Sequence, residues 1–242
     1  MNPVVIIPAR MASTRLPGKP LAEIAGQPMI VHVLRRAQEA DVGPVVVACA
    51  EQEIADAVIT AGGFAALTRP DHPSGSDRVW EALQSFDSQG NHDVIINVQG
   101  DLPTIEASAI RAALEPLSDR DVDISTLVAE ITEPSERDNP NVVKAVVAFS
   151  GGTRTGRALY FSRAAVPAGD GPLYHHIGLY AYRHHALERF VSLKPGILEQ
   201  RERLEQLRAL ENGMRIDAAL VDTVPFGVDT PADLKRAEHL LA

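Results

Sequence analysis

The chain has 242 residues, of which 45% are apolar and 23% are charged, a composition that allows a large buried core. Its net charge of −9 argues against an extended nucleic-acid surface, which needs a basic face. The apolar run at the N-terminus is too short for a membrane span and lacks the basic start of a signal peptide. We therefore expect a cytoplasmic protein with neither nucleic acid nor membrane as a partner. A single cysteine, Cys49, excludes an internal disulfide and a zinc site built on several thiolates.

Short apolar runs alternate with helical patterns in the first part of the chain. They predict strands at residues 4–7, 45–48 and 94–98, and helices at 29–40, 54–61 and 79–86. Such alternation is typical of βαβ units, and continuous apolar runs indicate strands that are buried on both faces. The sequence therefore predicts an α/β fold, with a mostly parallel twisted sheet and helices on both of its faces.

The pattern changes after about residue 120. Longer strands are expected at 124–131, 142–149 and 177–182, with a hairpin tip at 150–156 and a helix at 197–211 that Gly213 caps. No linker or repeat separates the two parts. We therefore expect one domain, 1–242, with a nucleotide-binding part at 1–120 and a substrate-side part at 121–242.

The strongest local signal is the loop at residues 8–20, which directly follows the first predicted strand. In an open α/β sheet, ligands bind beyond the carboxyl ends of the strands, where this loop lies. Its small residues permit close backbone approach, and Arg10, Arg15 and Lys19 offer charge and donors to a triphosphate. The loop is not a Walker A motif, because Ser13 replaces the first glycine and Pro20 the serine or threonine.

The same region carries most of the local positive charge. Residues 1–36 contain five Lys or Arg and one Glu, which gives +4 there and leaves −13 for the rest of the chain. We therefore expect an anionic ligand near the N-terminus.

Two carboxylates complete the predicted site. Asp101 follows a predicted strand, and Gly100 before it allows close approach of the backbone. A carboxylate in this position is a natural ligand for Mg²⁺. Asp229 precedes a predicted helix, so that either it or Thr230 would serve as the N-cap. The adjacent histidines at 175–176 and 184–185 cannot share one ion, because neighbouring side chains on a strand point to opposite faces.

Seven segments together resemble the 3-deoxy-manno-octulosonate cytidylyltransferases, which make the CMP-activated form of the acidic sugar 3-deoxy-D-manno-octulosonate (Kdo). They are residues 8–20, 74–78, 97–103, 160–163, 176–180, 204–208 and 227–234. The resemblance covers nearly the whole chain in one order. It implies a Rossmann-like fold of the nucleotide-diphospho-sugar transferase type, a homodimer, and CTP, Kdo and Mg²⁺ as ligands. The part at 121–242 would then bind the sugar and contribute to dimerisation.

The resemblance also implies roles for individual residues. The implied CTP ligands are Pro8, Ala9, Arg10, Ser13, Arg15, Lys19, Ser74 and Gly75. The implied sugar ligands are Arg78, Gln99, Arg163, His176, Glu205 and Gln206. Asp101 and Asp229 would bind magnesium, so that Asp229 would not serve as the helix cap. The resemblance implies that these two residues act in catalysis together with Lys19 and Arg10. The sugar's anomeric hydroxyl would attack the α-phosphorus of CTP directly.

The sequence departs from the family pattern in two places. Leu102 follows Asp101 where many members have Glu, and residues 48–50 are Ala-Cys-Ala where many have Ala-Thr-Asp. Carboxylates at those two positions cannot be required here. Three alternatives remain open at this stage: an enzyme of the same fold acting on 8-amino-Kdo or a sialic acid, a nucleotide-binding regulator without catalysis, and a metal-dependent glycosyltransferase.

Overall fold

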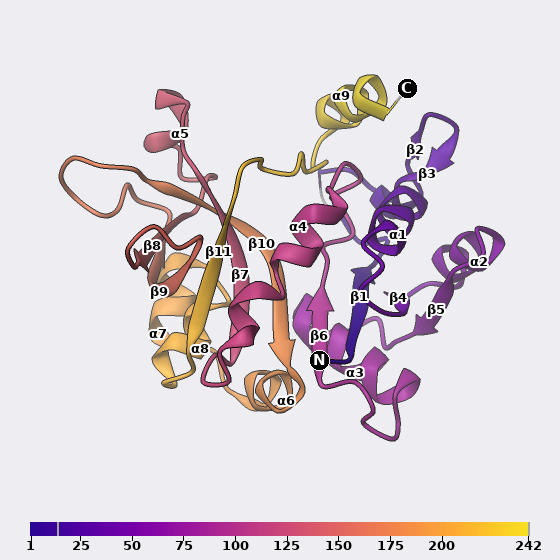
Figure 1. Cartoon of the computed structure of the whole chain (residues 1–242). Coiled ribbons are helices and arrows are strands. Elements are labelled where there is room, and N and C mark those ends of the chain that lie inside the picture. Colours follow the sequence, from indigo (N-terminus) through magenta and orange to yellow (C-terminus); the bar gives the residue numbers. More distant parts are fainter. Residues whose placement is uncertain (14, 242) are drawn as a thin grey trace. The chain divides into compact units, whose positions relative to one another are not determined.

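The computed structural model describes residues 1–13 and 15–241, and the chain divides into two compact units (Figure 1). Unit 1 comprises Met1–Arg111 and Pro225–Ala242, and unit 2 comprises Ala112–Val224. The expected subdivision grouped all residues after 120, whereas the C-terminal segment returns to unit 1. It does so because Val228 and Ala237 are buried in one apolar cluster with Ile24 and Met29.

Unit 1 contains a four-stranded parallel sheet in the order β5-β4-β1-β6. The strands are β1 (Pro3–Ala9), β4 (Val45–Cys49), β5 (Phe64–Leu67) and β6 (Val94–Asn97). Val4 to Ile7 in β1 are fully buried, as are Val94 to Ile96 in β6. Burial on both faces explains why these strands read as continuous apolar runs and confirms the predicted parallel sheet. Cys49 is buried at the end of its strand.

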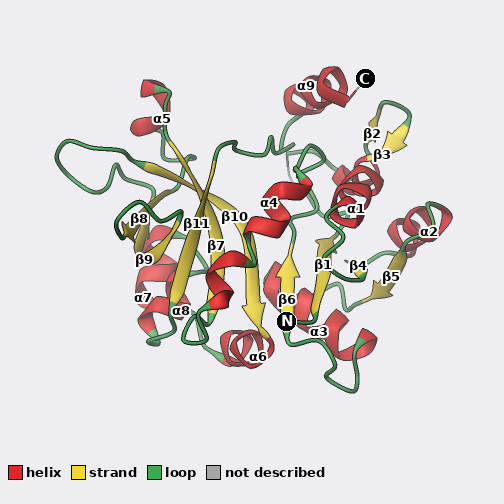
Figure 2. Ribbon diagram, viewed as in Figure 1, coloured by secondary structure: helices red, strands yellow, loops and turns green. Residues whose placement is uncertain are grey.

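Three main helices connect these strands: α1 (Met29–Glu39), α2 (Gln52–Thr60) and α3 (Gly75–Phe86). The chain moves from β1 to β4 and β5 in one direction and then returns to place β6 on the other side of β1 (Figure 2). Right-handed crossovers therefore put α1 and α2 on one face and α3 on the opposite face. The reversal lies between β1 and β6, and this is where an open α/β sheet forms its ligand crevice.

Smaller elements complete unit 1. The 3-10 helix η1 (Lys19–Leu21) follows the basic loop and leads into a hairpin of β2 (Glu23–Ile24) and β3 (Gln27–Pro28). Helix α9 (Pro231–Leu241) contacts β2, and helix α4 (Ala107–Ala112) ends at the boundary with unit 2.

Unit 2 contains a mixed five-stranded sheet in the order β10-β7-β11-β9-β8. The strands are β7 (Ile124–Glu130), β8 (Lys144–Phe149), β9 (Thr155–Ser162), β10 (Tyr174–Arg183) and β11 (Ile216–Val221). Only β7 and β11 pair in parallel, so the prediction of a mostly parallel sheet holds for unit 1 and fails here. The predicted hairpin tip at 150–156 does join β8 to β9.

The helices of unit 2 are short: η2 (Glu115–Ser118), α5 (Pro134–Arg137), α6 (His184–Ser192), α7 (Ile197–Glu202) and α8 (Leu207–Glu211). The prediction of a single helix at 197–211 is wrong. Arg203 takes a left-handed conformation, with φ 56°, and divides the segment into α7 and α8. Apolar spacing did not reveal this break, because Ile197 continues the helical spacing of Leu204 and Leu207 in the sequence, although Ile197 is 81% exposed and the two leucines are buried. Gly213, with φ 71°, follows the end of α8 as predicted.

Among the described residues, no helix has both the length and the apolar character needed to cross a bilayer.

Candidate active site

A pocket of about 410 Å³ lies in unit 1 at the carboxyl ends of β1 and β6. It gathers all the residues expected to bind CTP, both expected magnesium ligands, and two of the six expected sugar ligands, Arg78 and Gln99. The expected residues that line it are Pro8, Ala9, Arg10, Ser13, Arg15, Lys19, Ser74, Gly75, Arg78, Gln99, Asp101 and Asp229. The two motif loops follow the carboxyl ends of strands, as the sequence predicted, and the topology also places them at the reversal of strand order.

Gly100 lets the loops after β1 and β6 approach each other closely. A Cβ atom at this position would lie 2.7 Å from the backbone oxygen of Pro8, a distance that side chains do not tolerate. The glycine therefore brings the backbone before Asp101 against the start of the basic loop. Ser74 also lines the pocket and is the N-cap of α3, where its hydroxyl accepts a hydrogen bond from the Asp77 amide at 3.2 Å.

Lys19 joins the two carboxylates of the pocket. Its Nζ donates to Asp101 Oδ2 at 2.7 Å, to Asp229 Oδ1 at 3.0 Å and to the Val228 backbone oxygen at 2.9 Å. An ammonium has three donors, so all of them are used. Burial disfavours the charged form, yet the pKa of Lys19 lies above its ordinary value because Asp101 and then Asp229 outweigh that cost.

Asp229 does not cap the helix that follows it. Thr230 takes that role, because its hydroxyl accepts from the Asp233 amide at 3.2 Å while the Asp233 carboxylate accepts from the Thr230 amide at 2.9 Å. Asp229 is thereby left to contact Arg15 at 3.0 Å as well as Lys19. The capping alternative is thus excluded in the structure, and the carboxylate faces the pocket.

The carboxylates of Asp101 and Asp229 fit a magnesium ion by their chemistry and their convergence on one cation. Mg²⁺ is commonly held by one or two carboxylates together with phosphate oxygens and waters. Within residues 1–13 and 15–241, no group of three or more His, Cys, Asp or Glu side chains is arranged to hold a metal. Magnesium binding by the pair of carboxylates stays a prediction.

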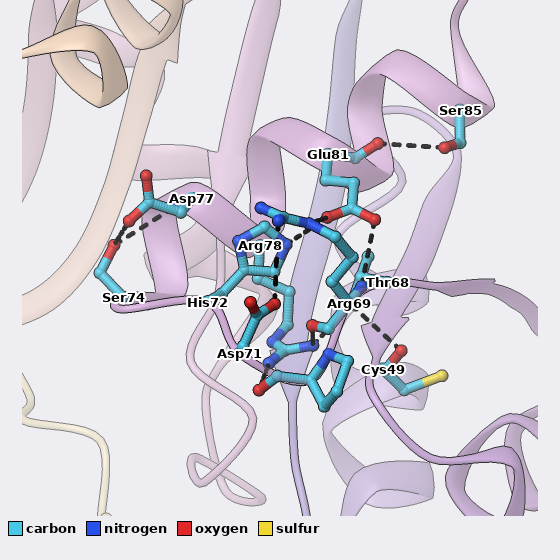
Figure 3. Close-up of polar contacts among 11 residues, drawn as sticks. Cys49, Thr68, Arg69, Asp71, His72, Ser74, Asp77, Arg78, Glu81 and Ser85 are labelled. Carbon is cyan, nitrogen blue, oxygen red and sulfur yellow. Dashed lines mark hydrogen bonds and ion pairs between the residues drawn. The ribbon is translucent and has the colours of Figure 1, made fainter.

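Arg78 is 2% exposed and its guanidinium holds the loop after β5 (Figure 3). It donates to Thr68 Oγ1 at 2.5 Å, to the Arg69 backbone oxygen at 3.1 Å and to that of Pro70 at 3.5 Å. Thr68 in turn donates to the backbone oxygen of Cys49 at the end of β4. Arg78 also lines the pocket, and a direct contact with the sugar stays a prediction.

A second residue of α3, Glu81, also contacts the loop at 68–72 (Figure 3). Glu81 accepts hydrogen bonds from the Arg69 backbone amide at 3.1 Å and from its side chain at 3.4 Å, and it also contacts His72. The loop at 68–72 is therefore fastened from two successive turns of the same helix.

The other four expected sugar ligands lie in unit 2, where His176 forms the centre of a buried group. The Thr126 hydroxyl, which has one proton to donate, lies 3.1 and 2.9 Å from the backbone oxygens of Ile177 and Leu179 and 3.0 Å from His176 Nε2. Because the hydroxyl proton is directed to a carbonyl, His176 Nε2–H donates to Thr126. Nδ1 is then free to accept from Gln206 Nε2 at 3.5 Å.

Burial, and secondarily His175, lowers the pKa of His176 to about 3. The imidazole is therefore neutral at physiological pH and serves as an oriented hydrogen-bonding group. Its ring lies edge-on against Phe161, with the ring centres 4.8 Å apart, and 5.5 Å from Tyr180.

Arg163 uses its guanidinium on three backbone carbonyls. It donates to Glu202 at 2.9 Å, to Pro140 at 3.0 Å and to Arg203 at 3.4 Å. These contacts join the end of β9 to the turn that precedes Glu205. The sugar-binding roles of Arg163 and Glu205 stay predictions.

Sequence reasoning missed Thr126, Tyr180 and the connecting contacts of Glu202. The signal for Thr126 was a polar pair, Ser125 and Thr126, inside an apolar strand, since buried polar side chains need hydrogen-bond partners. Tyr180 stands within the segment that carried the family resemblance but had no assigned role.

Comparison with known proteins defines the class first. Residues 4–216 match the family model described as cytidylyltransferase. The chain also resembles the solved 4-diphosphocytidyl-2C-methyl-D-erythritol synthase of Anaerococcus prevotii, with a TM-score of 0.66, 11% identity, and coverage of 99% of this chain and 98% of that one. At that identity the likeness concerns the fold alone, and it confirms the predicted fold class. The chain is thus a cytidylyltransferase.

Closer relatives narrow the class. The chain is 67% identical to the 3-deoxy-manno-octulosonate cytidylyltransferase of Paramagnetospirillum magneticum over 241 residues, which cover 100% of this chain and 98% of the relative. It is equally identical to the enzyme of that name from Rhodospirillum rubrum, over 99% of this chain and 95% of the relative. A solved CMP:2-keto-3-deoxy-manno-octonic acid synthetase complexed with CTP has a TM-score of 0.91 and 39% identity, covering 100% of this chain and 98% of that one. The chain belongs to the 3-deoxy-manno-octulosonate cytidylyltransferase family, as the resemblance of its motifs predicted.

Proposed function

We propose that the chain converts CTP and Kdo to CMP-Kdo and pyrophosphate, and so activates the sugar for lipopolysaccharide synthesis. The full-length identity of 67% to enzymes with this name supports the reaction. The observation that carries it is the pocket of unit 1, where Lys19 holds Asp101 and Asp229 together beside Arg10 and Arg15. These are the groups that a triphosphate and its counter-ion require.

The reaction is a single displacement at phosphorus. The oxygen of the sugar's anomeric hydroxyl forms a bond to the α-phosphorus, and the bond from that phosphorus to the oxygen bridging to the β-phosphate breaks. The hydroxyl loses its proton, and pyrophosphate leaves with the bonding electrons. Arg10, Arg15 and Lys19 offer positive charge to the departing phosphates, so no nucleophilic serine or cysteine is needed.

Asp101 and Asp229 are the proposed magnesium ligands. When bound there, magnesium would supply Lewis-acid polarisation of phosphate oxygens and lower the pKa of a coordinated hydroxyl. The side chains of the protein hold the carboxylates in position through Lys19 and, for Asp229, through Arg15 as well. The close approach of the backbone at Pro8 and Gly100 places Asp101 beside the basic loop that would bind the nucleotide.

The direct test measures pyrophosphate release from CTP by the purified protein with Kdo, with and without Mg²⁺. Parallel reactions contain 8-amino-Kdo, a sialic acid or no sugar. Release that requires both Kdo and Mg²⁺ supports the proposal. Faster release with another sugar reassigns the substrate, and CTP binding without any release would indicate a regulatory protein. If the protein instead consumes added CMP-Kdo when no pyrophosphate is present, it would be a glycosyltransferase.

A homodimer and a cytoplasmic location are also part of the proposal. The family resemblance supports the dimer, and the use of CTP, which cells make in the cytoplasm, supports the location. Sedimentation equilibrium of the purified protein tests the first, and a species with the mass of one chain at micromolar concentration would contradict it.

A further inference from the structure

Glu202, the last residue of α7, accepts hydrogen bonds from three residues of the segment at 160–163. Its Oε1 accepts from Ser162 Oγ at 2.9 Å and from the Tyr160 hydroxyl at 3.5 Å, while its Oε2 accepts from the Arg163 backbone amide at 3.1 Å. Hydrogen bonds to an ionised acceptor are stronger than neutral ones. This half-buried carboxylate therefore fixes the end of β9.

The contact is reciprocal, because Arg163 binds the helix end that carries Glu202. Its guanidinium takes the backbone oxygens of Glu202 and Arg203. In a continuous helix these oxygens would accept from the amides four residues later, at 206 and 207. A cation at the C-terminal end of a helix also suits the helix dipole. Arg163 thus ends α7 and stabilises the left-handed turn at Arg203.

That turn decides where the next residues lie. Glu205 and Gln206 follow it directly, and the Gln206 amide reaches His176. The far side is held by Arg208, which contacts Glu199 of α7 through two hydrogen bonds of 2.8 and 2.6 Å. A turn between two such attachments has little freedom.

From these contacts we infer that Glu202 is a positioning residue for sugar binding. Its carboxylate and its helix end hold Arg163 and the turn leading to Glu205 and Gln206 in one arrangement. The inference rests on the proposed function, since it takes the residues of unit 2 as the sugar side of the reaction. It assigns Glu202 no contact with the substrate.

The test compares steady-state kinetics of Glu202→Ala and Glu202→Gln with the wild type, varying Kdo and CTP separately. We expect Glu202→Ala to raise KM for Kdo about tenfold or more, the effect of losing a charge-assisted hydrogen bond. KM for CTP should stay within about twofold, because the residues assigned to CTP belong to unit 1. Glu202→Gln should recover most of the affinity, since its amide oxygen still accepts from the Arg163 amide.

Matched variants separate positioning from general stability. Glu188→Ala removes an exposed carboxylate from α6 of the same unit and should leave both KM values unchanged. Ser162→Ala removes one donor to Glu202 and should raise KM for Kdo by a smaller factor than Glu202→Ala. If Glu202→Ala does not fold, Ser162→Ala and Glu202→Gln decide the matter, and an unchanged KM for Kdo in Ser162→Ala overturns the inference.

Two further results are contrary and can be told apart. A Kdo-active wild type whose Glu202→Ala variant changes both KM values equally, or only kcat, overturns the positioning role alone. A wild type that does not use Kdo is recognised before any variant is made, and it overturns the proposed function together with this inference.

Discussion

Arg15 and Asp229 in the unit 1 pocket are partly in solvent, whereas the polar residues around His176 in unit 2 are buried. The side chains of Arg15 and Asp229 are 66% and 46% exposed, while His176 and Gln206 are 8% and 6% exposed. Exposed ion pairs contribute little to stability and exchange partners readily. Buried neutral groups are held by hydrogen bonds that are costly to break. The comparison indicates that unit 1 can exchange its ion pairs for phosphate contacts, and that unit 2 offers an arrangement built in advance.

The largest effect should come from the carboxylates of unit 1. Asp101→Asn keeps the shape of the side chain but removes the charge, and we expect kcat to fall by about 10² to 10³, as for other lost electrostatic contacts in active sites. Pyrophosphate release under saturating substrates measures it. Asp56→Asn, an exposed change on α2, is the matched control and should behave as the wild type. Near-normal turnover of Asp101→Asn would remove this residue from the mechanism.

Lys19→Met should have two effects of opposite sign. Without the ammonium, Asp101 and Asp229 have one competing cation fewer, so Mg²⁺ alone should bind a few times more tightly in calorimetry without nucleotide. KM for CTP should rise about tenfold because a phosphate-binding cation is lost. Lys235→Met on the exposed side of α9 serves as the control. Weaker binding of both ligands would show that Lys19 only supports the fold of the loop.

The smallest effect concerns the buried side of the comparison and appears in stability against pH. The pKa of His176 is about 3 in the folded protein and about 6.5 when unfolded, so between these values the unfolded chain binds the extra proton. Stability from this group is therefore complete above about pH 6.5 and is lost as the pH falls, by about 1 kcal/mol at pH 5.5. Urea unfolding at pH 7.5 and 5.5 measures the difference.

Between pH 7.5 and 5.5, the free energy of unfolding of His176→Gln should fall by about 1 kcal/mol less than that of the wild type, because glutamine does not titrate. His185→Gln, whose parent side chain is 72% exposed, is the matched control and should keep the wild-type dependence. An equal loss in wild type and His176→Gln would mean that His176 is accessible to protons in the folded state, and the contrast between the two units would then fail at this residue.

Local patterns in the sequence were sufficient for much of unit 1. Strands β1, β4 and β6 and helices α1, α2 and α3 were predicted within a few residues, because burial on two faces leaves continuous apolar runs and amphipathic helices leave a 3.6-residue period. The pocket residues were found because they lie in short segments that follow strands, and chain order fixes where such segments lie. Strand β5 was missed, since its residues are largely exposed or half-buried and carry no strong pattern.

Unit 2 depended more on contacts between distant residues. Strands β9 and β11 were not predicted. The helix at 197–211 was expected to be continuous, because the left-handed turn at Arg203 that breaks it is contacted by Arg163, which lies about 40 positions earlier. From local sequence, either Asp229 or Thr230 could have capped the following helix. The contacts of Asp229 with Lys19 and Arg15, which come from a distant segment, separate the two roles.

The sequence by itself determined the fold class, the phosphate-binding loop and the family, because these follow from local patterns and from motifs in a fixed order. Only the tertiary structure decided that Lys19 joins both carboxylates, that His176 is neutral, and that Glu202 and Arg163 hold each other. The physical reason is that charge, burial and hydrogen bonding depend on which distant segments meet, and a linear pattern does not contain that information.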